Sequence, residues 1–195
     1  MTDDIANPRK PEADADPQFR DRWSPRSFAE EPIPDEHVRA LFEAARWAPS
    51  SANSQPWLFV FARTVEDRAR FTAALNPGNQ KWAGRAPLLV FVLARRTSER
   101  SGKPLTHAWF DAGAAWVSLA LQARKLGLHA HAMGGFDRDR AYEATGASPD
   151  NYDVIAAVAV GRRGDPANLP DEDLREREKP NERKSLAEIV REGRV

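Results

Sequence analysis

Apolar and polar residues alternate with helical and strand spacing through the first half of the chain. Residues 34–36 (Pro-Asp-Glu) predict the start of a helix, because acidic side chains favour the positive end of the helix dipole. Apolar runs at 57–63 and 88–93 predict strands, and the unbroken second run should be covered on both faces. Between them we expect a helix near 66–75 and an Asn-Pro-Gly-Asn turn at 76–79. The apolar face of the first helix consists of Val38, Leu41, Phe42 and Ala45.

The segment 106–128 carries the longest helical pattern in the chain. Its apolar residues go most of the way round a helix: Trp109, Phe110, Ala112, Ala114, Ala115, Trp116, Val117, Leu119, Ala120, Leu121, Ala123 and Leu126. A helix that is apolar on nearly all sides must be buried on nearly all sides. It is therefore either a central core helix or a helix at a subunit interface. Its small residues would let a partner approach closely, so we favour a homodimer interface, with Gly127 closing the helix.

The rest of the chain continues the alternation of helices and strands. A short segment at 129–133 is followed by a helix that Asp137 caps and that runs to Thr145. An apolar run at 154–160 predicts another strand, and a final helix is expected from about 185 to 192. Alternating helices and apolar strands favour an α/β or α+β sheet layered with helices.

Length and composition indicate one domain preceded by a polar arm. With 195 residues, the chain is long enough to bury a substantial core. Residues 1–18 are rich in Asp, Pro, Lys and Ala, which predicts a disordered arm before a single domain at 19–195. The 29 Lys and Arg residues balance 29 Asp and Glu residues, so the chain lacks the positive charge expected of a nucleic-acid binder.

Several classes of protein are disfavoured by what the sequence lacks. Without cysteine there are no disulfides, thiolate metal sites or cysteine nucleophiles, and the four histidines show no metal-binding spacing with carboxylates. Residues 1–18 do not resemble a secretory signal, and no apolar stretch approaches the roughly 20 residues that span a bilayer. We therefore expect a cytoplasmic protein with no membrane partner. The glycine motifs of dinucleotide folds, phosphate loops and serine-hydrolase elbows are also absent.

A polar loop between two prolines, Pro49 and Pro56, is the most informative local feature. Proline fixes its own φ and restricts the residue before it, so such a loop is pre-organised. Rigid loops rich in amide and hydroxyl groups suit a planar heterocycle that donates and accepts hydrogen bonds. The alternative is a simple capped turn. The hydroxyl and carboxamide side chains of this loop are Ser50, Ser51, Asn53, Ser54 and Gln55.

Two groups of cationic side chains are candidate anion sites. Arg22, Ser24 and Arg26 alternate, so their side chains point the same way in an extended segment. Because a guanidinium matches phosphate bidentately, this group suits a phosphate or polyol, although a surface salt-bridge cluster has the same pattern. Arg183 and Lys184 stand at the start of the last expected helix. Cations are favourable there if an anion binds between them and the helix amides; otherwise they form a solvated basic face.

Two further positions have a possible role near a ligand. Gly134 and Gly135 lack a Cβ, so the backbone there can approach a ligand face closely, or it can simply form a tight turn. Asp111 lies within the long helix, where we expect a local cap or a buried hydrogen-bond partner rather than an acid catalyst.

Together these segments resemble the nitroreductase family of FMN-dependent oxidoreductases over about residues 19–192. The resemblance depends on the order and spacing of the motifs rather than on any one of them. In chain order the motifs are Arg22-x-Ser24-x-Arg26, Ala48-Pro49-Ser50-Ser51-Ala52-Asn53-Ser54-Gln55-Pro56-Trp57, Asn79 before Ala86-Pro87, Asp111-x-Gly113-x-Ala115, Gly134-Gly135-Phe136, Val158-Ala159-Val160-Gly161 and Arg183-Lys184-Ser185-Leu186.

The resemblance implies a nitroreductase-like α+β fold with three layers, α/β/α, in which helices flank a mixed, mainly antiparallel sheet. It also implies a homodimer formed through the long central helix, with FMN at each subunit junction. Neither a catalytic side chain nor a metal is implied, because the flavin carries the hydride chemistry. The residues that would bind FMN are Arg22, Ser24, Arg26, Pro49, Ser50, Ser51, Asn53, Gln55, Asn79, Met133, Gly134, Gly135, Arg183 and Lys184.

The same resemblance assigns parts of the cofactor to these residues. The segment 22–26 would hold the phosphate, the ribityl chain and the pyrimidine edge, and the two C-terminal cations would complete the phosphate site. The loop 49–55 would come from the partner subunit, whereas Asn79 would reach the ring from the first subunit. Residues 133–135 would lie against the isoalloxazine near its reactive nitrogen.

Two positions depart from the family pattern. Many relatives have Lys or Arg about three residues after the position of Asn79, where this chain has Trp82 beside Lys81. Ala52 replaces the usual glycine of the polar loop. The implied reaction is ping-pong: NADH or NADPH reduces FMN, and a nitroaromatic, quinone or similar small-molecule acceptor reoxidises it. The alternatives are a dehalogenating or dehydrogenase-type relative and a non-catalytic FMN-binding module.

Overall fold

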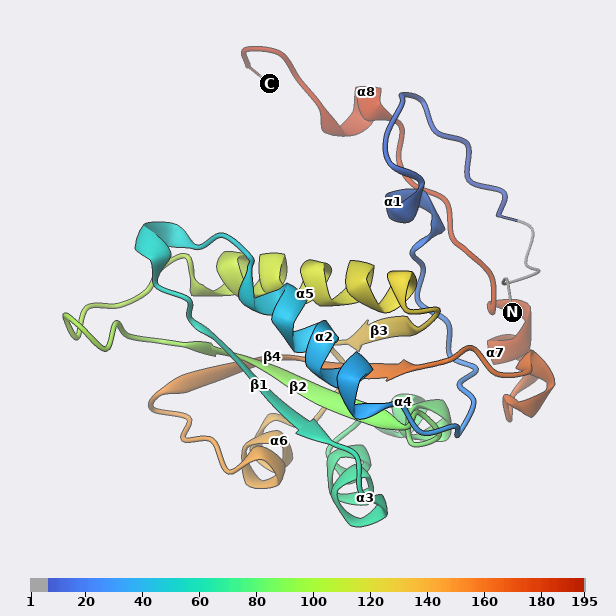
Figure 1. The fold of residues 1–195 in the computed structure, drawn as a ribbon, viewed down its shortest axis with the longest axis horizontal. Helices are drawn as coiled ribbons and strands as arrows, with labels where there is room; N and C mark the ends of the chain where they lie inside the picture. Colours follow the sequence, from blue (N-terminus) through green and yellow to red (C-terminus); the bar gives the residue numbers. More distant parts are fainter. Residues whose placement is uncertain (1–6, 195) are drawn as a thin grey trace.

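The computed structural model describes residues 7–194 and contains a sheet with helices on both sides (Figure 1). The strands of this sheet are β1 (Trp57–Ala62), β2 (Leu88–Arg95), β3 (His129–Met133) and β4 (Tyr152–Gly161). The α-helices are α1 (Pro17–Asp21), α2 (Asp35–Arg46), α3 (Val65–Ala73), α4 (Pro77–Ala83), α5 (Ala108–Lys125), α6 (Arg138–Thr145), α7 (Glu172–Glu176) and α8 (Leu186–Ile189).

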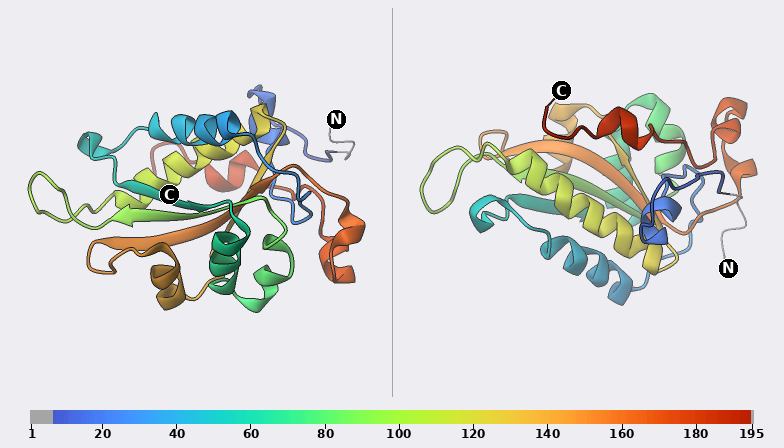
Figure 2. Two further views of the ribbon diagram at one scale, coloured as in Figure 1. Left: turned by 60° about the horizontal axis from the view of Figure 1, so that its bottom comes forward. Right: turned by 90° about the horizontal axis from the view of Figure 1, so that it is seen from above.

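The elements form three layers. The strands lie in the order β1-β2-β4-β3, and each neighbouring pair is antiparallel. Helices α2 and α5 cover one face of the sheet, and α3, α4 and α6 cover the other (Figures 1 and 2). The predicted α+β fold with helices on both faces of the sheet is therefore confirmed. No helix within residues 7–194 is long and apolar enough to cross a membrane.

Strand β2 is at the centre of the core because its side chains alternate between two apolar layers. The side chains that pack with α3, α4 and α6 are Leu89, Phe91 and Leu93. Those that pack with α2 and α5 are Leu88, Val90, Val92 and Ala94. All of them are buried, so the prediction that this apolar run is covered on both faces is confirmed.

The turn expected at 76–79 is instead the beginning of helix α4. Asn76 occupies the N-cap position, and Pro77 occupies the first helical position, where its missing N–H costs no intrahelical bond. Asn79 therefore projects from a helix rather than from a turn. The last helix is shorter than expected and ends at Ile189. Helices α1 and α7 are single turns of five residues, too short to show an apolar period in the sequence.

Helix α5 packs one face against the sheet and α2 and leaves the other face uncovered in the single chain. On the uncovered face, Phe110 is 79% exposed, Trp109 48% and Val117 42%. A central core helix, one of the two alternatives, would have no such face. The helix ends as predicted, because Gly127 follows it with a φ of +69°, a left-handed conformation that suits glycine. The buried residues of α5 are Ala108, Asp111, Ala112, Ala115, Leu119, Ala120 and Ala123.

The two terminal segments run side by side beyond the edge of the sheet (Figure 1). Arg9 Nε donates to the carbonyl of Asn181 at 2.6 Å, and the N–H of Leu186 donates to the Glu12 carboxylate at 3.1 Å. The part of the predicted N-terminal arm that the structure describes thus contacts the C-terminal segment. Residues 1–6 of that arm lie outside the described residues.

Candidate functional site

A buried carboxylate joins the segment that contains Arg22 to the C-terminal part of the chain. Glu178 is only 6% exposed, and its carboxylate accepts hydrogen bonds from the backbone of Arg26 and Ser27 at 2.8 Å. It also accepts a bond of 2.5 Å from the Ser27 hydroxyl. These bonds fix the backbone of the 22–27 segment beside residues 178–183. Sequence reasoning missed Glu178, because one glutamate within a charged stretch gives no signal.

The structure brings together three of the predicted phosphate-binding residues. Arg22 Nη1 donates to Ser24 Oγ at 3.2 Å, as expected of alternating residues on an extended segment. Burial, and then the positive charge of Arg183, lower the pKa of Arg22. Arg22 and Arg183 are thus close enough to repel one another. Arg26 acts on the same region, since burial most of all, and then the charges of Arg26 and Arg22, lower the pKa of His131.

Helix α8 does not form the anion site that its flanking cations suggest. The N–H of Leu186 already donates to Glu12, and the N–H of Ser185 donates to Glu188 at 2.9 Å. These carboxylates occupy the amides that an anion would need. Lys184 is exposed and lines a groove of about 670 Å³ between the two terminal segments. The cationic cluster therefore depends on guanidinium groups and not on the helix N-terminus.

Arg9 is a third guanidinium of this cluster and was not predicted from the sequence. Its Nη1 donates to the carbonyls of Arg20 and Arg22, each at 2.8 Å, and its Nε donates to Asn181. Burial, and then the charges of Arg183 and Arg22, lower the pKa of Arg9, whereas Asp21 raises it. The composition of the N-terminal arm indicates disorder and so hides any role of a residue within it.

His131 on β3 contacts the backbone of the segment 22–27. Its Nδ1 lies 2.8 Å from the carbonyl of Pro25, which makes Nδ1–H the donor. Burial lowers the pKa of His131 to about 4, so the ring is neutral near pH 7. The ring packs against Trp82, with 4.6 Å between the ring centroids. Trp82 is 2% exposed and belongs to the core, while Lys81 beside it pairs with Asp171 at 2.7 Å.

Two residues beyond His131, β3 ends at the residues predicted to face the flavin ring. Asn79 Nδ2 donates to the carbonyl of Gly135 at 2.9 Å, which joins helix α4 to the end of the strand. A Cβ on Gly135 would lie 2.7 Å from Asn79 Nδ2, so a side chain there would displace Asn79. Gly134 is exposed, but Met133 is 4% exposed and packs in the core. Met133 can therefore contact a ligand only through its backbone.

The polar loop is held at the other end of helix α5. Ser50 Oγ accepts from the N–H of Gln55 at 3.0 Å, and the buried Asp111 carboxylate accepts from the N–H of Ser51 at 3.1 Å. Asp111 is thus a buried hydrogen-bond partner, as predicted. The loop backbone is unusual, because Ala52, Asn53 and Gln55 have φ of 49°, 54° and 47°. At Ala52, this left-handed conformation would suit a glycine better.

The loop does not reach the cationic cluster within one chain. Asp111 lies in the first turn of α5, whereas Trp23, next to Arg22, packs its ring against His129, just after the last turn. The 18 residues of α5 separate these ends by about 27 Å. The loop at 49–55, in which Ser51, Asn53 and Gln55 are exposed, lies at the far end of α5 (the cyan segment before β1 in Figure 1).

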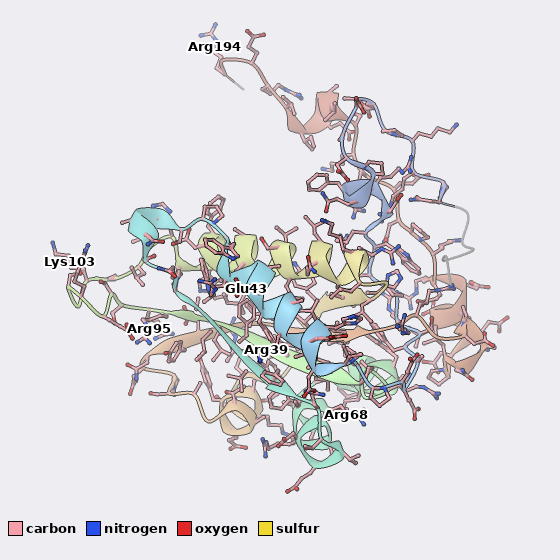
Figure 3. The ribbon with its side chains drawn as sticks, viewed as in Figure 1. Arg39, Glu43, Arg68, Arg95, Lys103 and Arg194 are labelled. Atoms are coloured by element: carbon pink, nitrogen blue, oxygen red, sulfur yellow. The ribbon has the colours of Figure 1, made fainter. Side chains whose placement is uncertain are left out.

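A second cavity, of about 680 Å³, lies beside the polar loop rather than at the cationic cluster. Residues 51–58 form one side of it, and residues 98–108 form much of the other. Lys103 and Arg95, which also line it, are at the same end of the molecule (Figure 3). The loop is thus open to a ligand or to a second chain.

The cationic cluster has the properties of a phosphate site. Arg9 donates to the carbonyl of Arg22 and lines the same groove as Arg183, and its Nη2 is buried without a hydrogen-bond partner among the described residues. A buried donor without an acceptor is uncommon in native proteins, and a bound anion would satisfy this one; Nε of Arg68 and Nε of Arg163 are buried without a partner in the same way. No metal-binding group of His, Asp and Glu side chains occurs within the described residues. The site can therefore hold an anion and has no side-chain set for a metal.

The sequence of the chain matches the model of a known protein family. The family model described as "Nitroreductase family" matches residues 19–80 and 73–162, which is most of the chain. The chain belongs to the nitroreductase family. The family that the sequence motifs resemble is therefore confirmed.

Individual nitroreductase relatives extend the comparison over almost the whole chain. A protein of Xanthomonas oryzae pv. oryzae, named "Putative NADH dehydrogenase/NAD(P)H nitroreductase", is 33% identical over 79% of this chain and 87% of its own. A crystal structure described as an oxidoreductase containing FMN is 47% identical, covers 97% of each chain and has a TM-score of 0.90. A crystal structure from Desulfovibrio desulfuricans, described as "a putative nitroreductase in complex with fmn", is 26% identical with a TM-score of 0.72, covering 91% of this chain and 95% of that one.

Proposed function

We propose that two copies of this nitroreductase bind FMN at their junctions and transfer hydride from NADH or NADPH to small electron-poor acceptors. Nitroaromatics and quinones are the acceptor classes we propose. The FMN-containing relatives and the names of the NAD(P)H nitroreductases support this class of enzyme and these cofactors. The observation that carries the proposal for this chain is the cluster of Arg9, Arg22 and Arg183 around an unpartnered, buried Nη2.

The residues of the chain would bind and orient the cofactor. Arg22 and Arg183 would bind its phosphate through charge-assisted hydrogen bonds, and Ser24 would supply a hydroxyl beside them. Asn79, which holds the carbonyl of Gly135, would keep the end of β3 flat for an aromatic ring to lie against. When bound, FMN supplies the hydride chemistry, which explains the absence of a catalytic triad from the sequence.

A homodimer would complete the site. The exposed apolar face of α5, with Trp109, Phe110 and Val117, is a surface that a second copy could cover. In a two-fold dimer with antiparallel α5 helices, the N-terminal end of one helix lies beside the C-terminal end of the other. The polar loop of one chain would then approach the cationic cluster of its partner. We propose residues 19–195 as the single domain that forms this dimer in the cytoplasm.

The absorbance spectrum of the purified protein tests this function directly. We expect yellow protein with FMN bound at one per chain, and bleaching of the flavin by NADH or NADPH under anaerobic conditions. A panel of nitroaromatics and quinones should then restore the colour. A colourless protein that ignores added FMN would refute the proposal. Sedimentation equilibrium measures the dimer separately, and a monomer that retains FMN would refute only the shared site.

One observation favours a second candidate, a non-catalytic FMN-binding module. Many relatives have a cation near the position of Trp82, but here the indole is buried and Lys81 is paired with Asp171. The flavin would then lack a positive charge on this side when it is reduced. Stopped-flow reduction distinguishes the two candidates: a module would bind FMN tightly but be reduced very slowly by both nicotinamides. Turnover of an organic halide or an azoline, but not of nitroaromatics, would indicate another type of flavoenzyme.

A further inference from the structure

We infer that Arg9, from the N-terminal segment, is a further residue of the cofactor phosphate site. The inference rests on the proposed function, because it takes FMN as the ligand of the cluster. It assigns to the N-terminal segment a role that its composition conceals. The segment would be part of the binding site rather than a tail in front of the domain.

The geometry of Arg9 is that of a side chain held in place for a ligand. Two of its guanidinium nitrogens are fixed by backbone carbonyls: Nη1 by Arg20 and Arg22, and Nε by Asn181. The third nitrogen, Nη2, is buried and has no partner among the described residues. A planar guanidinium fixed at two nitrogens has a determined position for the third. Nη2 is therefore a pre-oriented donor that lacks an acceptor.

The charges around Arg9 identify the kind of acceptor. Arg183 and Arg22 act on it as positive charges, and Asp21 is the negative charge that acts on it. Asp21 also pairs with Arg20 at 3.0 Å, so the guanidiniums of Arg9, Arg22 and Arg183 leave an excess of positive charge. A phosphate monoester carries a charge of about −1.5 to −2 at pH 7, so it would offset more of this excess than a single carboxylate would.

Lys10, the residue next to Arg9, does not share the fixed geometry of Arg9. Lys10 is exposed and makes no hydrogen bond or ion pair within residues 7–194. It also lines the groove between the terminal segments, beside Arg183 and Lys184. Lys10 is thus a matched control, with the same charge and neighbourhood as Arg9 but without its fixed geometry.

The experiment compares the binding of FMN with that of riboflavin, which has the same ring and no phosphate. Fluorescence titration would measure both dissociation constants for the wild-type protein and for Arg9→Ala, Arg9→Lys and Lys10→Ala. One charge-assisted hydrogen bond corresponds to about a tenfold to hundredfold change in affinity. We expect Arg9→Ala to weaken FMN binding by this factor and to leave riboflavin binding unchanged. Arg9→Lys should lie between wild type and Arg9→Ala, and Lys10→Ala should match wild type.

Each other outcome overturns a distinct statement. Equal loss of FMN and riboflavin binding in Arg9→Ala would mean that Arg9 only joins the terminal segments, and unchanged FMN binding would mean that it has no role. If Arg9→Ala does not fold, the Arg9→Lys variant tests the phosphate contact instead. Weaker binding of FMN but not of riboflavin would support the contact, and unchanged binding of FMN would refute it. Wild-type protein that binds neither flavin would instead refute the proposed function, whatever the variants do.

Discussion

Replacing Glu178 by alanine tests how the cationic segment is held. The carboxylate accepts from three donors: the N–H of Arg26, the N–H of Ser27 and the hydroxyl of Ser27. Alanine would leave all three without an acceptor, next to a serine that is only 3% exposed. Little water can reach this buried position, so the three donors would stay largely without hydrogen bonds.

The magnitude follows from counting these donors. A buried donor left unsatisfied costs about 1–3 kcal/mol, and part of the loss is offset because the buried charge of Glu178 disappears. We expect Glu178→Ala to lower the free energy of unfolding by about 3–5 kcal/mol. For a chain of this length, 1 kcal/mol shifts the melting temperature by about 2–4 °C, so the melting temperature should fall by about 6–20 °C. Glu178→Gln keeps one acceptor oxygen and should lie between alanine and wild type.

Thermal unfolding followed by circular dichroism, without added flavin, measures this effect. Glu176→Ala is the control, since Glu176 is exposed and close in sequence and should change the free energy by less than about 0.5 kcal/mol. The double variant Glu178→Ala with Ser27→Ala should be less destabilised than the sum of the single variants, because the two residues share a bond. Equal melting temperatures of Glu178→Ala and Glu176→Ala, or additive effects of Glu178→Ala and Ser27→Ala, would refute this role of Glu178.

Two further predictions concern β3 and its end. Because the pKa of His131 is about 4 in the folded protein and 6.5 in its ordinary state, the unfolded chain takes up the proton first as the pH falls. The fold should therefore lose up to about 3 kcal/mol between pH 6.5 and pH 4, and urea unfolding of His131→Asn should show a flatter pH profile. Gly135→Ala places a Cβ 2.7 Å from Asn79 Nδ2, so FMN titration should show weaker binding, while Gly146→Asn, at a distant helix end with a φ of +68°, should bind normally. Unaltered binding by Gly135→Ala would mean that Asn79 has room to move.

The fold was largely predictable because its strands and long helices have clear apolar spacing. The run at 88–93 is too short for a long helix, and a strand with no polar side must be covered on both faces, so it could be assigned to a central strand. The helix at 77–83 was missed for a local reason. Asn76, Pro77 and Gly78 form a turn signal, yet the same Asn-Pro pair also suits the N-cap and first position of a helix.

The candidate site was predictable only where its residues occur in short, ordered motifs. Arg22 and Ser24 alternate, and the structure places them in contact. Arg9 and Glu178 are single charged residues in stretches with many charges, and their role depends on contacts across more than 150 positions of sequence. No spacing rule reaches that far. Burial decides which of many arginines and glutamates matter, and the sequence alone does not give it.

The two halves of the proposed phosphate site depend on different forces. Glu178 joins the 22–27 segment to the C-terminal part through bonds that need no ligand. Arg9, Arg22 and Arg183, by contrast, repel one another until an anion lies between them. A ligand that binds only the folded chain adds about 2.7 kcal/mol of stability at a concentration of 100 times its dissociation constant. That gain in stability should be concentrated in the terminal segments, because only there would the bound phosphate replace repulsion between guanidiniums by attraction. In the absence of the phosphate, the Glu178 contact limits how far those segments can separate.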